Sequence, residues 1–98
     1  VMKVGHVPLV EYCRPGAPAV ADTIEQLIHS YRAKGLSLRA VMCDKLGPQV
    51  WGANPSVAMA TLEELEETAK LWLRGGCAAK PLAESSIQEL RELFKASW

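Results

Sequence analysis

The segment Leu38–Cys43 most constrains the fold of this chain, because it carries apolar residues on both faces of a strand. Alternate side chains of a strand point to opposite faces, so both faces of this one need a cover. Arg39 is the charged exception in the run. Two segments of helical period, 18–34 and 55–74, stand before and after it, and each has a single apolar stripe. The sequence therefore predicts an α/β unit in which helices cover a central strand.

Residues that favour helix ends mark the limits of both helices. Pro18 stands where the first helical residue belongs, and Gly35 follows the last turn. Asn54 precedes a proline at the start of the second helix, which Gly75 ends. We expect both apolar stripes to face the sheet. They consist of Val20, Ile24, Leu27, Ile28 and Tyr31 in the first helix, and of Ala58, Leu62, Leu65, Ala69 and Trp72 in the second.

The remaining elements are shorter. Residues 7–12 are β-rich with an early proline, which indicates an edge strand, and residues 49–52 form a third strand joined to 38–43 by a turn. Ser85 and Gln88 have the spacing of a capping box and predict a last helix. The predicted order is β-α-β-β-α-α, with a small, mostly antiparallel sheet covered by helices. The last helix has the stripe Ile87, Leu90, Phe94 and Trp98.

Composition narrows the class of partner and the setting. Eleven basic residues balance eleven acidic ones and about half of the chain is apolar, which argues against binding to nucleic acid or to a membrane. Cys13, Cys43 and Cys77 form no CxxC pair, so a reducing, cytoplasmic setting is expected. Residues 1–98 are expected to form one unit. Because the chain begins at Val1, we expect it to be trimmed or to be a portion of a longer protein.

Candidate metal ligands are few. Zinc needs three or four converging His, Cys or carboxylate side chains. His29 lies opposite the apolar stripe of its helix and is interpreted as a solvated surface histidine, with a ligand role as the alternative. His6 precedes the first strand, and no local partner supports a function for it.

Nucleophiles and paired carboxylates are equally weakly supported. Cys43 ends a strand beside Lys45, where catalytic groups commonly lie, but a free cysteine more often packs as a small hydrophobe. Lys45 as an imine-forming lysine would need desolvation that a turn does not provide. Four glutamates fan around the second helix, and Glu66 is placed to pair with Lys70, so we interpret them as a solvated face. The four are Glu63, Glu64, Glu66 and Glu67.

Taken in order, three stretches of the chain resemble the C-terminal half of a class II aldolase/adducin family domain. They read V-P-L-V-E-Y-C-R-P-G-A-P, then L-R-A-V-M-C-D-K-L-G-P-Q-V-W-G, then L-E-E-L-E-E-T-A-K-L-W-L. The family includes fuculose-phosphate aldolase, ribulose-phosphate epimerase and the adducin head. The resemblance implies that residues 1–98 are the C-terminal portion of a larger domain, with small phosphorylated sugars as substrates of the intact protein.

The resemblance also implies a zinc cofactor held by three histidines. Two belong to an H-x-H motif in the preceding half, and the third to an N-H-G turn five residues before the tryptophan of V-W-G. In this chain that turn reads Lys45-Leu46-Gly47, so Leu46 occupies the ligand position and cannot coordinate zinc. We therefore assign no catalytic, cofactor-binding or metal-ligating residue within this chain.

Two functions stay open at this point. The chain is either part of a class II aldolase-like lyase or epimerase that is inactive alone, or a non-catalytic binding and assembly module in the manner of adducin. In both cases we expect the exposed sheet edge to recruit either a second copy, giving a homo-oligomer, or the missing N-terminal half.

Overall fold

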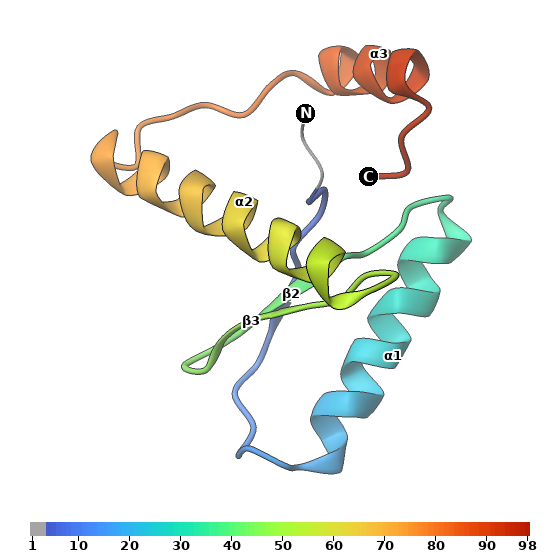
Figure 1. The fold of residues 1–98 in the computed structure, drawn as a ribbon, viewed down its shortest axis with the longest axis vertical. Helices are drawn as coiled ribbons and strands as arrows, with labels where there is room; N and C mark the ends of the chain where they lie inside the picture. The colour runs from blue at the N-terminus through green and yellow to red at the C-terminus, as the bar shows by residue number, and fades with distance from the viewer. Residues whose placement is uncertain (1–3) are drawn as a thin grey trace.

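The computed structural model describes residues 4–98, and within them it contains three helices and three strands. The order β-α-β-β-α-α and the α/β class are confirmed, with helices and sheet arranged as in Figure 1. The elements are β1 (Leu9–Val10), α1 (Pro18–Ala33), β2 (Ala40–Cys43), β3 (Gly47–Val50), α2 (Pro55–Arg74) and α3 (Glu84–Phe94).

The sheet has the order β1-β2-β3 and is mixed. β2 pairs antiparallel with β3 through a hairpin, whereas β1 runs parallel to β2 with Leu9 opposite Met42. The prediction of a mostly antiparallel sheet needs this correction. Its cause is connectivity: α1 carries the chain from the end of β1 back to the start of β2, and such a crossover leaves the two strands parallel.

The strands are also shorter than the predicted ranges 7–12 and 38–43, and β3 begins two residues before the predicted 49–52. The hairpin turn is tighter than expected, because Gly47 already pairs with Cys43. Gly47 has a φ of 103°, which favours glycine at this position.

The core lies where β1 and β2 face α1. Val10, Val41 and Cys43 are buried there, and the α1 side chains Ile24 and Leu27 pack against them. The apolar stripe of α1 therefore faces the sheet as predicted, although none of its residues is fully buried. The interpretation of Cys43 as a small buried hydrophobe fits this position.

α2 is supported by the sheet along its first half only. Thr61 is buried, whereas Ala69 and Trp72, both assigned to the core stripe, are exposed. That part of the prediction is wrong for a reason of length. A helix of 20 residues spans about 30 Å, whereas strands of 4 residues span about 13 Å. The C-terminal half of α2 therefore extends beyond the sheet (Figure 1).

The start of α2 is capped by a side chain. Asn54 Oδ1 accepts a hydrogen bond of 3.0 Å from the backbone N–H of Val57. Replacing Asn54 by alanine should lower the free energy of unfolding by about 1 kcal/mol, because one N–H at the helix start loses its acceptor. Urea unfolding followed by circular dichroism measures the change. Asn54→Asp is the control, and equal losses in both variants would show that the cap does not stabilise the helix.

α3 differs most from its prediction. It begins at Glu84 with Ala83 as N-cap, and no side chain caps it, so the capping box of Ser85 and Gln88 is not formed. Phe94 is exposed, whereas Trp98 is buried. α3 stands off from the sheet in Figure 1, contrary to the prediction that all three helices pack on it.

The segment that follows α3 ties it to the body of the molecule. The backbone N–H of Ser37 donates to Ser97 O at 2.6 Å, and the side chain of Arg39 donates to Ser97 Oγ at 3.3 Å. Gly5 passes so close to Trp98 that a Cβ at this glycine would lie 2.6 Å from the Cβ of the tryptophan. In the described part of the chain, none of the helices has the length and apolar character needed to cross a membrane.

Candidate functional site

The turn that carries Leu46 is the tip of the β2–β3 hairpin. The backbone N–H of Leu46 donates to Cys43 O at 3.1 Å, and Lys45 takes a left-handed conformation with a φ of 64°. The side chain of Leu46 is 47% exposed. β2 is anchored from the other side, because the N–H of Asp44 donates to Val10 O. The tip therefore presents residue 46 to the outside from a supported backbone.

The chemistry of this tip does not fit a zinc site. Leu46 has no donor atom, and the Asp44 carboxylate lies 3.5 Å from the ammonium of Lys45. Cys43 points into the core and is 3% exposed. Among residues 4–98, no group of three His, Cys, Asp or Glu side chains could hold a metal ion. A metal at this turn would have to depend on ligands outside the described chain.

The other single candidates lie apart from the tip. His29 is exposed and its Nε2 lies 3.6 Å from Glu25 on the same helix, as expected for a surface histidine. His6 is exposed, and its ring centre lies 5.4 Å from that of Tyr31. Cys13 is half-buried and Cys77 is exposed, and both are free thiols. Lys45 is exposed, as the interpretation of a solvated turn lysine requires.

The carboxylates of α2 form a fan rather than a converging pair. Glu63, Glu66 and Glu67 are exposed. Lys70 Nζ lies 2.9 Å from Glu67 Oε1, so its ion pair forms with Glu67 and not with the predicted Glu66. The hydrogen bond to Glu67 and the charge of that residue raise the pKa of Lys70, with a smaller contribution from Glu66.

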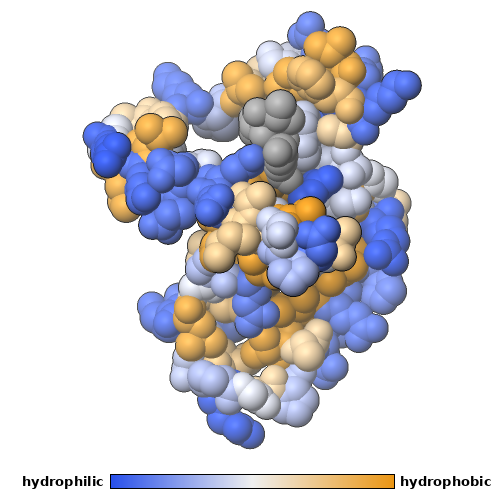
Figure 2. Space-filling model, viewed as in Figure 1, coloured by the Kyte–Doolittle hydropathy of each residue, from blue (hydrophilic) through white to orange (hydrophobic). Residues whose placement is uncertain are grey.

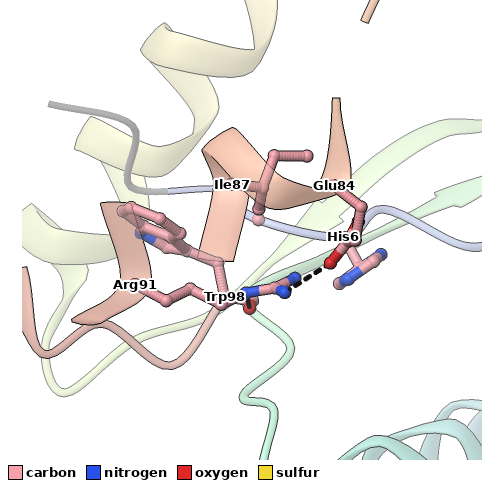
Figure 3. Close-up of a pocket in the computed structure, with 6 residues that line it drawn as sticks. His6, Glu84, Ile87, Arg91 and Trp98 are labelled. Carbon is pink, nitrogen blue, oxygen red and sulfur yellow. Dashed lines mark hydrogen bonds and ion pairs between the residues drawn. The ribbon is translucent and has the colours of Figure 1, made fainter. Parts of the chain in front are cut away.

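A cavity of about 210 Å³, which sequence reasoning missed, lies between α3 and the N-terminal segment. Arg91 lies at its centre and donates to Glu84 Oε1 at 2.7 Å and to Trp98 O at 2.8 Å (Figure 3). Ile87 and His6 complete the wall. The spacing of Glu84 and Arg91, two helical turns apart, was the available signal. The arginine holds the end of the chain against α3.

A second, more open hollow of about 630 Å³ runs along α1. Val20, Ile24 and Ile28 line it on the helix, and Gln49 lines it on β3. Figure 2 shows hydrophobic side chains gathered over this side of the molecule. Its polar lining consists of Glu25 and Gln49, which do not converge on a reacting group.

The sequence was compared with protein families, curated proteins and solved structures. The family model described as Class II Aldolase and Adducin N-terminal domain matches residues 1–73. The chain belongs to the class II aldolase and adducin family. This confirms the resemblance inferred from the sequence, and it makes the β2–β3 hairpin the part of the class II aldolase fold that carries the ligand turn.

Curated class II aldolase relatives share one printed name, 3-oxo-tetronate 4-phosphate decarboxylase. The protein from Cupriavidus necator is 45% identical over 103 residues, which cover 100% of this chain and 44% of the relative. Its counterpart from Pectobacterium atrosepticum is 38% identical, covering 92% of this chain and 38% of the relative. The Escherichia coli K12 protein is 37% identical, with coverage of 93% and 40%. No solved structure matches the chain.

The chain thus spans less than half the length of the curated relatives that it matches. What those relatives act on is carried by their whole sequences. The described residues of this chain contribute a sheet, its helices and one hairpin tip to that fold.

Proposed function

We propose that this chain is the C-terminal portion of a class II aldolase-like protein for phosphorylated four-carbon sugar acids, and that it has no turnover on its own. The substrate class comes from the name shared by the relatives, 3-oxo-tetronate 4-phosphate decarboxylase, with 45% identity across the full chain in one case. The lack of independent activity is inferred from the hairpin tip. Leu46 stands where the family resemblance places a histidine ligand.

The chemistry of such a substrate explains why the tip matters. When a 3-oxo acid loses carbon dioxide, the electron pair of the broken bond passes into the oxo group, which becomes an enolate. Lowering that barrier needs positive charge or hydrogen-bond donors placed at the enolate oxygen. At this tip the cation is Lys45, whose side chain is 74% exposed and paired with Asp44. A solvated, paired ammonium stabilises an enolate weakly.

The direct test uses the purified chain with 3-oxo-tetronate 4-phosphate and added divalent metal ions. We expect carbon dioxide release at the uncatalysed rate, because the tip supplies no metal ligand and no desolvated cation. A parallel reaction with the Cupriavidus necator decarboxylase is the positive control. Metal-dependent release of carbon dioxide by the chain alone would refute the proposal.

The alternative is a binding and assembly module without catalysis, in the manner of adducin. The substitution at Leu46 favours it, because a fold that keeps the hairpin without its ligand keeps the shape and loses the chemistry. The two functions differ in the intact protein. Turnover there supports the lyase, whereas stable assembly with neither turnover nor bound metal supports the module.

A further inference from the structure

The C-terminal half of α2 carries apolar side chains that nothing in the described chain covers. Every residue from 66 to 74 is exposed, and Leu73 is exposed to 70%. Leu71 and Trp72 beside it are exposed as well. The helix extends into solvent along this stretch in Figure 1. An exposed apolar helix face of this kind is typical of an interaction surface.

One side of α2 has the spacing of a helix-pairing seam. Counting from Met59, the positions alternate in steps of three and four residues, which places them in one line along the helix. We call this line the α2 seam; it consists of Met59, Leu62, Glu66, Ala69 and Leu73. An open groove of about 580 Å³ runs along it, and its lining includes Met59, Leu62 and Glu66. The seam is thus hollowed and accessible.

The charges beside the seam choose the partner. Glu63 and Lys70 also line the groove, one helical repeat of seven residues apart and on the same side of the seam. Two copies of α2 that lie antiparallel bring the first repeat of one helix beside the second repeat of the other. Glu63 then faces Lys70 of the second copy, and the twofold axis forms the same pair again. In this register Leu62 lies opposite Leu73 of the second copy.

A parallel arrangement has the opposite sign. It would place Glu63 beside Glu63 and Lys70 beside Lys70, so that like charges meet at both positions. Glu66 lies in the seam itself and faces Ala69 of the second copy in the antiparallel register, where the small side chain leaves room for its carboxylate to reach solvent. Like-charge repulsion and the size of Ala69 both favour the antiparallel pair.

We propose that the α2 seam binds the α2 seam of a second copy of this chain, antiparallel, with Leu62 against Leu73 and Glu63 against Lys70 across the twofold axis. The partner is specified by complementarity of one surface with itself, which is the condition for a twofold dimer. This proposal is independent of the proposed function, because it concerns a face of α2 and not the hairpin tip.

The test is sedimentation equilibrium of the chain through the micromolar range. The unmodified chain should form a dimer that weakens as salt is raised, because the flanking pairs are exposed. Leu73→Glu should raise the dissociation constant more than about 100-fold, since the twofold axis removes two buried leucines at once. Leu93→Glu is the matched control, because Leu93 is 71% exposed on α3, and it should leave the dimer unchanged.

A charge exchange tests the register. Glu63→Lys alone and Lys70→Glu alone should each raise the dissociation constant about tenfold, because each creates two like-charge contacts. The double variant should restore the original value, with helix content checked by circular dichroism. A chain that stays monomeric, a dimer insensitive to Leu73→Glu, or a double variant that fails to recover while remaining helical would each overturn the proposal.

Discussion

Leu46→His is expected to create zinc binding only when the preceding half of the family fold is supplied. In the isolated chain one new ligand is not enough, because a zinc site needs three or four converging donors. Combined with the corresponding preceding portion of the Cupriavidus necator decarboxylase, the variant should bind zinc more than about 100-fold more tightly than the unmodified chain in the same hybrid. Loss of a mere outer-shell partner already costs about 10- to 100-fold. Calorimetry and metal analysis of the purified hybrid give the two affinities.

Lys45→His in the same hybrid is the matched control. It places an imidazole at the neighbouring tip position, whose φ of 64° points the side chain elsewhere. We expect no gain in zinc affinity from it. Equal affinity in the unmodified hybrid and in the Leu46→His hybrid would show that Leu46 is not at the ligand position. Formation of each hybrid is checked by size-exclusion chromatography.

Val41→Asp is expected to unfold the chain. Val41 is 0% exposed at the centre of the sheet, and its neighbours in the core are Val10 and Cys43, which offer a carboxylate no partner. Burying an unpaired polar group there should cost more than about 4 kcal/mol, close to the whole stability of about 5 to 15 kcal/mol of a small domain. Far-ultraviolet circular dichroism with urea titration measures the loss.

The same substitution at Leu9 separates burial from β-propensity. Leu9 lies on the adjacent strand and is 67% exposed, so Leu9→Asp should cost less than about 1 kcal/mol. Val41→Ala, which removes two methyl groups without adding charge, should cost about 2 kcal/mol. If Val41→Asp were no more destabilising than Leu9→Asp, the assignment of the core to the α1 side of β2 would be wrong.

The ends of α1 and α2 could be predicted because local signals determine them. Pro18 starts α1 and Asn54 caps α2, each within a few residues of the backbone groups that it serves. The last helix shows the limit of such signals. Ser85 and Gln88 satisfy the capping pattern, yet α3 starts at Glu84, whose later partner Arg91 is bound by the end of the chain as well. A contact that depends on the terminal segment is invisible to a local pattern.

The candidate site divides in the same way. That Leu46 lacks a donor atom is a property of the residue type and needs no coordinates. That it lies exposed at a hairpin tip, while Cys43 three residues earlier is buried, depends on the register of β2 against β3. Alternation along a strand predicts that neighbours differ, but the packing of α1 decides which of the two faces becomes the core.

By itself the sequence determined the α/β class, the order of the elements, the limits of α1 and α2, and the identity of the residue at the ligand turn. These depend on side-chain chemistry and on interactions within about one helical turn. Tertiary structure alone decided the parallel pairing of β1, the unsupported half of α2 and the Arg91 contacts. Each of these depends on how far one element reaches relative to another, and sequence periodicity does not encode that length match.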